Sequence, residues 1–300
     1  PGAVHQGRNS IFLTLKRSFH GRGDRPASFS NSTQAKYQKY LKSYANWTTA
    51  RTVEPNDVQD LRDAFKRAED DGLHVEMLTL EPVAGEGNPG VVLSNDFYDE
   101  ARKLTFDHHS LLLVDSIQAG LRTRGNLSIL DSQFCQQSMA PDFETFSKAL
   151  MGGQYPFSVL AVNERVSEHY KLGLYGNTMT SNPRGLSVAT AMLKSLTPSL
   201  RENIVSSGIQ FDKTLKKLQI EFPHIITEVT GTGLLMAAHI NPKYSVEGRN
   251  GVEEKVRLKG LNVIHGGTNA LRFTPWFHLT SQEINLMEDI LRDVFSNLKE

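Results

Sequence analysis

Three polar side chains of this sequence have neighbours that point to chemistry: Asp115, Lys148 and Arg272. Asp115 directly follows four consecutive apolar residues, which is typical of an acid at the end of a buried strand. Lys148 lies among apolar residues, and burial disfavours the ammonium form of a lysine and makes its amine a nucleophile. Arg272 also has apolar neighbours, and an arginine in such a place can bind a carboxylate through two parallel hydrogen bonds.

Each of these side chains also has another interpretation that the residues alone leave open. Asp115 would suit the magnesium-binding acid of a P-loop nucleotidase, but the sequence has no Gly-x-x-x-x-Gly-Lys-Ser/Thr loop. It could equally cap the helix that follows its strand. Lys148 could extend its amine to solvent along an apolar surface, and Arg272 could form a structural ion pair.

The composition excludes several classes of protein. The 300 residues contain 33 Lys and Arg against 33 Asp and Glu, so net charge gives no support for a general nucleic-acid or membrane-surface binder. No apolar run approaches the ~18–20 residues of a membrane span. The single cysteine, Cys135, excludes an internal disulfide framework and a zinc site of several thiolates, and we predict no metal site. We expect a reducing compartment: the cytoplasm, with the mitochondrial matrix as the alternative.

Helices and buried strands alternate in the first half of the chain. We predict strands over 11–15, 75–80 and 111–114, a helix that is capped by Asn56 and stops at Gly72, and a second helix around Phe97–Leu104. Strands that are apolar on both faces predict a mostly parallel sheet flanked by helices. Such sheets bind ligands beyond the carboxyl ends of their strands, where Glu81 and Asp115 lie. Residues 24–55 show no period, and we predict a long polar surface connection there.

The last third of the chain predicts a smaller α+β domain. We expect helix over 184–222, two short strands within 224–240, a helix over 252–259, strands over 261–265 and 270–274, and a final helix. Thr280 and Glu283 form a capping box at the start of that helix, and Ile284, Met287, Leu291, Val294 and Leu298 form its apolar stripe. We therefore divide the chain into a large domain, 1–190, and a small domain, 191–300.

Several segments form an ordered set along the chain. They are Ser18-Phe19-His20-Gly21-Arg22, Glu81-Pro82-Val83-Ala84-Gly85-Glu86-Gly87, Leu113–Gly120 followed by Arg124-Gly125, Pro141–Leu150, Gly176-Asn177-Thr178 with Asn182-Pro183, and Leu271-Arg272-Phe273. This set resembles the class III pyridoxal-phosphate (PLP) aminotransferases, the ornithine, acetylornithine and 4-aminobutyrate group. The resemblance implies the α/β fold of type I PLP-dependent transferases, with the large domain binding PLP. It also implies transfer of an amino group from an amino acid to a 2-oxo acid.

The resemblance assigns roles to residues around the cofactor. Lys148 would hold PLP as a Schiff base and then carry a proton between substrate and cofactor. Asp115 would pair with the pyridinium nitrogen, so that the ring can accept the electrons of a carbanion. Phe19 and Ile117 would sandwich the ring. His20 and Gln118 would also bind the cofactor, Gln118 at its phenolic oxygen.

The resemblance also implies a substrate site and a dimer. Arg272 would bind the substrate carboxylate, with Glu81 or Glu86 as its gating partner. Thr178 would reach the phosphate of the partner subunit, because family active sites lie at the interface of a homodimer. The donor would be ornithine, lysine or another diamino or omega-amino acid.

The sequence departs from the family pattern in two places. Ser116 stands where the family usually has Glu, and Ala119 stands where it has Thr. The sequence also begins after the N-terminal arm and after the family's Ser-Gly phosphate loop at a helix start, so we expect a separate chain or a further segment to supply that part. The alternative to a working aminotransferase is a catalytically inactive aminotransferase-like subunit with a structural or regulatory role in a larger assembly. A third hypothesis is a PLP enzyme of another reaction on the same fold.

Overall fold

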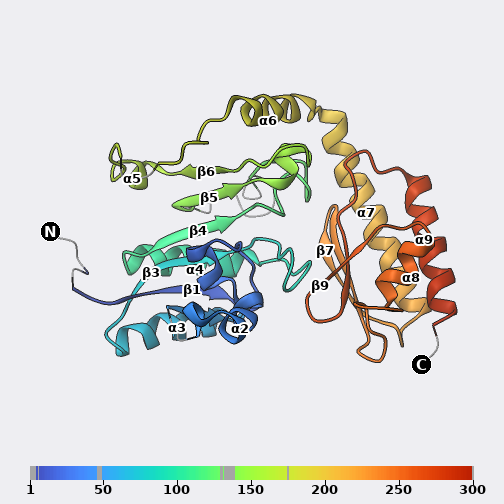
Figure 1. Ribbon diagram of the computed structural model, residues 1–300, viewed down its shortest axis with the longest axis horizontal. Coiled ribbons are helices and arrows are strands. Elements are labelled where there is room, and N and C mark those ends of the chain that lie inside the picture. The colour runs from blue at the N-terminus through green and yellow to red at the C-terminus, as the bar shows by residue number, and fades with distance from the viewer. Residues whose placement is uncertain are drawn as a thin grey trace. The chain divides into compact units, whose positions relative to one another are not determined.

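The computed structural model describes residues 5, 7–45, 49–128, 131, 139–173 and 176–298 (Figure 1). The chain divides into two compact units. Unit 1 consists of Pro1–Pro82, Leu93–Gln118 and Leu127–Ser195, and unit 2 consists of Val83–Val92, Ala119–Asn126 and Leu196–Glu300. It stays a prediction that residues 1–190 bind the cofactor and that residues 191–300 form the small domain.

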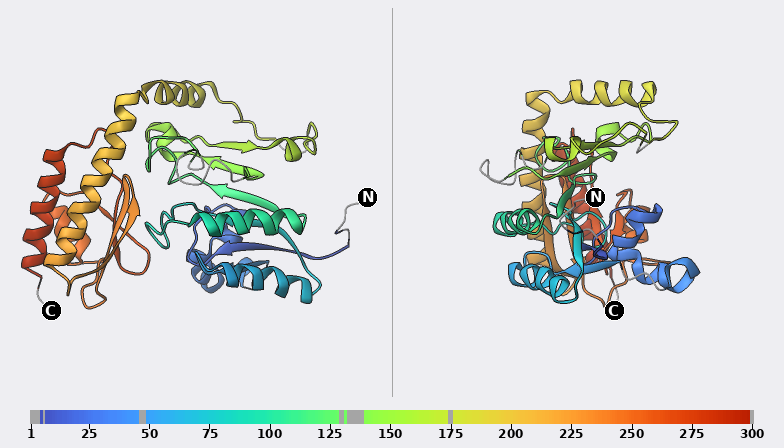
Figure 2. Two further views of the ribbon diagram at one scale, coloured as in Figure 1. Left: turned by 180° about the vertical axis from the view of Figure 1, so that it is seen from behind. Right: turned by 90° about the vertical axis from the view of Figure 1, so that its left-hand side faces the viewer.

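Unit 1 is built on one mixed sheet. Among the described residues this sheet has six strands in the order β2-β1-β3-β4-β5-β6, parallel except for β6. The strands are β1 Ser10–Leu15, β2 Ala50–Val53, β3 His74–Leu80, β4 Leu111–Asp115, β5 Phe143–Phe146 and β6 Val159–Val162. Helices α3 (Val58–Asp70) and α4 (Asn95–Asp107) cover one face, and α1 (Asp24–Phe29) and α2 (Asn31–Tyr40) lie on the other (Figure 2). The predicted α/β class with a mostly parallel sheet is confirmed.

Helix α3 shows how the sequence determines these elements. Leu61, Phe65 and Ala68 recur at helical spacing, and all three are buried. The predicted cap was wrong by one residue: the side chain of Asp57, not Asn56, accepts the hydrogen bond from Asp60 N–H. The Asn56 side chain instead accepts a hydrogen bond from Ser94 N–H at 2.8 Å, which ties α3 to the start of α4.

The predicted irregular connection over 24–55 was wrong. This segment holds α1, α2, a 3-10 turn η1 (Lys42–Tyr44) and the edge strand β2. Helix α2 buries no side chain and therefore has no apolar period to detect, and in β2 only Val53 is buried. Both elements are fixed by their neighbours in the fold rather than by their own pattern.

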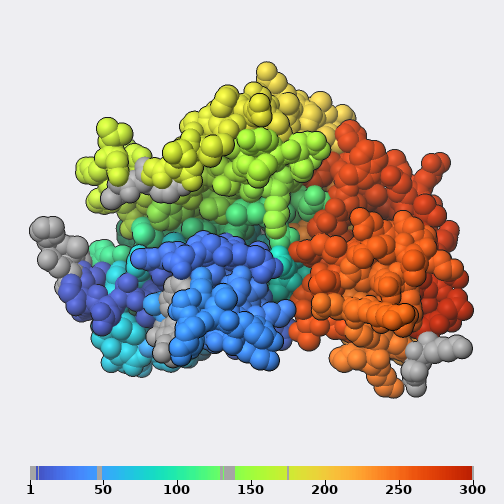
Figure 3. Space-filling model, viewed as in Figure 1, coloured from blue at the N-terminus to red at the C-terminus, as the bar shows by residue number. Residues whose placement is uncertain are grey.

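The chain beyond β5 completes unit 1. It forms the 3-10 turn η3 (Lys148–Met151), β6, α5 (Glu164–Ser167) and α6 (Pro183–Ser195). Ala189 of α6 packs on Phe146, Leu150 and Met151. All four residues of β6 are exposed, and this green-to-yellow part of the chain lies at the surface in Figure 3.

Unit 2 is an antiparallel sheet with packed helices. Among the described residues its four strands have the order β7-β8-β10-β9. The elements are α7 Pro198–Glu221, β7 Ile226–Thr232, β8 Leu235–Ile240, α8 Val252–Leu258, β9 Ile264–Gly266, β10 Ala270–Phe273 and α9 Ser281–Ser296. The ring centroids of Phe211 on α7 and Phe273 on β10 lie 5.4 Å apart. This unit has the α+β architecture expected for the end of the chain.

Two predictions about elements of unit 2 had different outcomes. The capping box of Thr280 and Glu283 at the start of α9 is confirmed. The strand predicted over 261–265 was wrong at its start, because Leu261 N–H still closes the end of α8 by donating to the carbonyl oxygen of Val256 at 3.2 Å.

Candidate active site

A cavity of about 160 Å³ lies at the carboxyl ends of the parallel strands of unit 1. It is lined by Phe19, His20, Gly21, Glu81, Asp115, Ile117, Gln118 and Lys148. These residues follow or end β1, β3, β4 and β5, which are neighbours in the sheet. The structure thus brings together seven of the residues that the sequence singled out, and Asp115 and Lys148 line the same cavity.

Asp115 is buried at the end of β4, with 7% of its surface exposed. Its Oδ1 accepts hydrogen bonds from Ile117 N–H and from the Thr145 hydroxyl, each at 3.1 Å. Its Oδ2 lies 2.9 Å from Nδ1 of His20. A carboxylate has about four acceptor positions, so the donors from the described residues leave one position on Oδ2. The carboxylate is therefore held in place and can still accept one hydrogen bond.

His20 connects Asp115 to two buried hydroxyl groups. Its Nε2 lies 3.2 Å from Oγ1 of Thr14, which in turn lies 2.7 Å from Oγ of Ser18. The sequence did not single out Thr14, Ser18 or Thr145 as site residues. The available signal was a polar residue, Thr14, within an otherwise apolar buried strand, because a buried hydroxyl needs a partner.

Lys148 lines the cavity, but the residue is exposed, so the prediction of a buried amine was wrong. The reason is its place in the chain. The alternation of buried and half-buried residues ends with β5 at Phe146, and Lys148 begins η3 two residues later, with a φ of 41°. Lys148 therefore lines the cavity from an exposed position.

The remaining lining residues are also fixed by hydrogen bonds or by the strand ends. Glu81 is buried, and its Oε1 accepts a hydrogen bond from Phe19 N–H at 2.8 Å. The guanidinium carbon of Arg22 lies 5.3 Å from the centre of the Phe19 ring. Ile117 and Gln118 follow β4 directly. Glu81 therefore positions the aromatic residue that was predicted to pack on the cofactor.

Ser116, which departs from the family pattern, is anchored by a second buried acid. The Ser116 hydroxyl donates to Oε1 of Glu144 at 2.5 Å, and the Ser128 hydroxyl donates to Oε2 at 2.8 Å. Glu144 lies on β5 opposite Val114, and the sequence did not single it out. The feature of the sequence that could have indicated Glu144 is an acidic residue in a short segment that begins and ends with phenylalanine. Glu144 thus holds the chain on both sides of the excursion 119–126 that belongs to unit 2.

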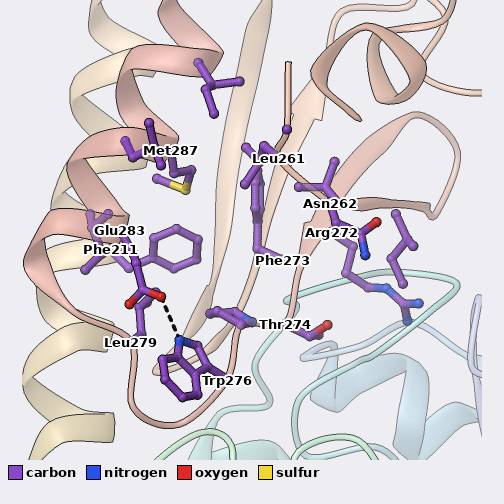
Figure 4. A pocket seen from close by; sticks show the side chains of 17 residues that line it. Phe211, Leu261, Asn262, Arg272, Phe273, Thr274, Trp276, Leu279, Glu283 and Met287 are labelled. Carbon is purple, nitrogen blue, oxygen red and sulfur yellow. Dashed lines mark hydrogen bonds between the residues drawn. The ribbon is translucent and has the colours of Figure 1, made fainter. Parts of the chain in front are cut away.

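Arg272 lies on β10 in unit 2, where it lines a second cavity of about 420 Å³ (Figure 4). Its guanidinium points away from Phe211 and Met287, and its Nη1 donates to the carbonyl oxygen of Gly85 at 2.8 Å. The carbonyl oxygen of Glu86, which lies with Gly85 in the segment Val83–Val92 of unit 2, accepts a hydrogen bond from Gly267 N–H at 2.7 Å. Arg272 and its predicted gating partner Glu86 therefore belong to one unit.

A second arginine of unit 2 is near Arg272. Burial, with repulsion from Arg272 as a smaller contribution, lowers the pKa of Arg122 to about 10. The Arg122 Nη1 donates to the carbonyl oxygen of Pro275 at 2.5 Å, and its guanidinium carbon lies 5.3 Å from the centre of the Phe277 ring. The charges of Arg122 and Arg272 are thus close enough to repel each other.

Thr178 does not line the cavity of unit 1. It is exposed in a turn that follows Asn177, and its predicted contact with a partner's phosphate stays a prediction. Within the described ranges no group of three His, Cys, Asp or Glu side chains could hold a metal ion, and Cys135 lies outside these ranges. None of the helices in the part of the chain that the structure describes has the length and apolar character of a membrane span.

The sequence model of the class-III aminotransferases matches residues 3–295. The chain therefore belongs to this family, as its motifs indicated. It is similar to the acetylornithine aminotransferases of Xanthomonas campestris pv. campestris (30% identical) and Xanthomonas axonopodis pv. citri (31%), covering 94% of this chain and 66% of each relative. The chain thus spans about two thirds of the length of these relatives.

Solved structures with the same fold confirm the predicted fold class. The ornithine aminotransferase of Toxoplasma gondii ME49 has a TM-score of 0.80 at 24% identity, covering 96% of this chain and 65% of its own. An amine transaminase from an uncultivated Pseudomonas species, solved in its PLP-bound form, has a TM-score of 0.82 at 19% identity, covering 98% and 71%. The chain thus has the fold of these two solved structures.

Proposed function

We propose that this chain acts as a PLP-dependent aminotransferase, moving an amino group from an amino acid to a 2-oxo acid. The observation that carries the proposal is the cavity of unit 1, because Asp115 and Lys148 both line it in a member of the class-III family. Glu81 and Glu144, which hold the residues around them, support a site that is built rather than accidental.

The residues of the cavity fit PLP. Asp115 keeps one acceptor position on Oδ2, which suits the protonated nitrogen of a pyridine ring. Phe19 and Ile117 offer an aromatic and an aliphatic surface for a flat ring, and Gln118 offers an amide for its phenolic oxygen. When bound, PLP supplies an electron sink for the carbanion formed at the substrate carbon.

The side chains of this chain would divide the remaining work. The Lys148 amine would attach the cofactor and then take and return the proton of the substrate carbon. Asp115 would hold the ring nitrogen in its protonated form through a charge-assisted hydrogen bond. Arg272 would bind the substrate carboxylate with two parallel hydrogen bonds, and Glu81 or Glu86 would gate it.

Substrate, partner and compartment are further parts of the proposal. The names of the relatives support ornithine, acetylornithine or another diamino acid as the donor. We also propose a homodimer in the cytoplasm, with Thr178 reaching the phosphate of the partner's cofactor. An inactive subunit is the second candidate, and the exposure of Lys148 favours it.

Cofactor attachment tests the proposal directly. The protein is incubated with PLP, reduced with borohydride, digested and analysed by mass spectrometry. We expect a pyridoxyl group on Lys148 and its loss in Lys148→Ala. The matched control is Lys103→Ala, which removes an exposed lysine of α4 whose amine lies 3.7 Å from Asp107 and which should leave the labelling of Lys148 unchanged. Folded protein that is labelled at other lysines only, or at none, would contradict the proposal and favour the inactive subunit.

A further inference from the structure

The cavity that Arg272 lines lies within unit 2, and its buried side chains are apolar (Figure 4). Its volume of about 420 Å³ falls within the range of about 300–1,000 Å³ that is usual for the sites of small ligands. The rings of Phe211 on α7 and Phe273 on β10 meet edge to face there. Ile284 and Met287 of α9 also line the cavity and are buried. The unit 2 cavity can therefore take an apolar group out of water.

Three large apolar side chains that line the same cavity are exposed. Ile264 on β9, Trp276 after β10 and Leu286 on α9 are 39%, 58% and 59% exposed. Exposed apolar side chains are ordinary when they are scattered, but a group of them around one cavity is typical of a binding site. A ligand that fills the unit 2 cavity would also cover these three side chains.

One acidic side chain, Glu283, lines this cavity and is held in place at the start of α9. Its Oε2 accepts hydrogen bonds from the N–H of Thr280 at 2.8 Å and from the Thr280 hydroxyl at 2.7 Å, and its Oε1 accepts one from Nε1 of Trp276 at 3.1 Å. The hydrogen bonds from Thr280 hold the pKa of Glu283 below its ordinary value, so Glu283 is a carboxylate at neutral pH. A carboxylate has about four acceptor positions, so the donors from the described residues leave one position on Oε1.

The groups near this carboxylate favour a cation. The indole N–H of Trp276 is used in donating to Glu283, so Trp276 offers a ligand its ring, and an aromatic ring attracts cations. Among the described residues that line the cavity, Arg272 is the other charged one. Its guanidinium points away from Phe211 and Met287 (Figure 4). The charge beside the apolar part of the cavity is thus negative.

We propose that the unit 2 cavity binds an amine with an apolar body, in its ammonium form. The ammonium group donates to Oε1 of Glu283 beside the ring of Trp276, and the apolar body lies against the buried side chains of α7, β10 and α9. A carboxylate ligand would be repelled by Glu283, and a neutral ligand would not form the charge-assisted hydrogen bond. No described residue lines both this cavity and that of unit 1, so the inference goes beyond the proposed aminotransferase and does not depend on PLP.

The test compares three probes that share a phenyl ring and differ in charge: phenethylamine, phenethyl alcohol and hydrocinnamate. The sequence has two tryptophans, so Trp47→Phe leaves Trp276 as the source of tryptophan fluorescence. We expect phenethylamine to change this fluorescence in a saturable way, with a Kd roughly 10-fold below that of phenethyl alcohol and still further below that of hydrocinnamate. Isothermal titration calorimetry on the wild type without PLP measures the same three constants independently of fluorescence.

A substitution of Glu283 separates its charge from its role in the helix. Glu283→Gln removes the charge, and glutamine at this position can also complete a capping box. Phenethylamine should then bind roughly 10-fold more weakly, whereas phenethyl alcohol should bind as it does to the wild type. The matched control is Asp289→Asn, which neutralises an exposed acid of α9 that pairs with Arg292 at 3.5 Å and does not line the cavity. It should leave all three constants unchanged.

A second pair of variants blocks the cavity and leaves Glu283 in place. Leu286 lies one turn after Glu283 on α9, so the ammonium introduced by Leu286→Lys can reach the same carboxylate and compete with the ligand. Ile220→Lys makes the same change at a residue of α7 that is 81% exposed and does not line the cavity. We expect the response of Trp276 to phenethylamine to be lost in the first variant and unchanged in the second. Both positions are exposed, so both variants should fold.

The inference would be overturned by a wild type that does not bind phenethylamine, or that binds it no more tightly than phenethyl alcohol. A preference for the amine that survives Glu283→Gln, or equal losses in Leu286→Lys and Ile220→Lys, would also overturn it. Asp115→Asn identifies any binding of the amine in unit 1, since it should leave the response of Trp276 unchanged. The pyridoxyl label is a separate result: folded protein that binds phenethylamine at Trp276 but takes no label on Lys148 contradicts the proposed function and leaves this site standing.

Discussion

Two buried aspartates lie at opposite ends of the same strand pair in unit 1. Asp142 precedes β5 and accepts a hydrogen bond from Leu112 N–H of β4 at 2.8 Å, whereas Asp115 ends β4 and accepts from Thr145 of β5 at 3.1 Å. Asp142 is 0% exposed, and its oxygens also accept hydrogen bonds from the side chains of Arg102, Asn163 and Arg165. Asp115 lines a cavity and keeps an acceptor position. A carboxylate whose hydrogen-bond acceptor positions are all occupied holds strands together. A carboxylate with one acceptor position left can bind a ligand.

The side chains that pair with the two aspartates also differ. Asp142 is paired with Arg102 at 2.8 Å, and a guanidinium keeps its charge in a protein. Asp115 instead has the imidazole of His20 beside it, with 2.9 Å between Oδ2 and Nδ1. Burial alone would raise the pKa of Asp142, but hydrogen bonds from Leu112, Arg102 and Asn163 outweigh it and hold that pKa below its ordinary value. Asp142 is thus held by a guanidinium, which is always charged, and Asp115 is held by an imidazole and by neutral donors.

Replacing Asp142 should have the largest effect on stability. Asp142→Asn leaves Arg102 buried with its charge uncompensated, which typically costs about 3–5 kcal/mol. We expect the free energy of unfolding, measured by urea denaturation, to fall by that amount. The control is Asp71→Asn, whose carboxylate pairs with Arg51 at the surface and should change the same quantity by less than about 1 kcal/mol.

The pH dependence of unfolding checks the same assignment. Because the folded pKa of Asp142 is lowered, its stabilisation is complete above the unfolded pKa of about 3.9 and is lost as the pH falls through the folded value. The stability difference between wild type and Asp142→Asn should therefore shrink below about pH 4. A difference that is constant down to the lowest pH at which the protein folds would mean that Asp142 is not a charged partner of Arg102.

Replacing Asp115 should lower stability less than replacing Asp142, but it should lower activity. In Asp115→Asn the amide oxygen can still accept from Ile117 N–H and from the Thr145 hydroxyl, and the amide nitrogen can donate to Nδ1 of His20, so we expect a stability loss of about 1–2 kcal/mol. In PLP-loaded protein the lost charge-assisted hydrogen bond, worth about 1.5–3 kcal/mol, should slow turnover roughly 10- to 150-fold. Urea denaturation and an amino-transfer assay measure the two effects. An Asp115→Asn protein as unstable as Asp142→Asn would remove the distinction between the two acids.

The sequence singled out residues that line one cavity, but it did not predict the contacts between them. Asp115 and Lys148 could be found because one ends an apolar run and the other lies in a family motif. The contact of His20 with Asp115 joins residues 95 positions apart, and it exists because β1, β3 and β4 end at one edge of the sheet. That order depends on strand pairing, which no local pattern specifies. The same holds for Asp142, since its partner Arg102 reads as one polar residue of an amphipathic helix.

The predictions that were wrong have a common physical origin. Helix α2 has no buried face, so its helical period carries no apolar signal. Lys148 has apolar neighbours in the sequence, but Ala149 and Leu150 are buried while Lys148 is exposed, because a 3-10 turn rotates successive side chains to different sides. Burial was inferred from neighbours along the chain, and it is decided by neighbours across the sheet.

The smallest effect should come from a donor that is not a cation. Thr145→Val removes the hydroxyl that donates to Asp115 Oδ1 and keeps the shape of a strand residue, while Ile117 N–H still donates to that oxygen. We expect urea denaturation to show a loss of about 0.5–1.5 kcal/mol. Thr52→Val, at a half-buried position of β2, is the matched control and should be close to neutral. Equal losses in both variants would show that the Thr145 hydroxyl does not hold Asp115. A loss confined to Thr145→Val would show that even a neutral donor contributes to keeping this carboxylate in place.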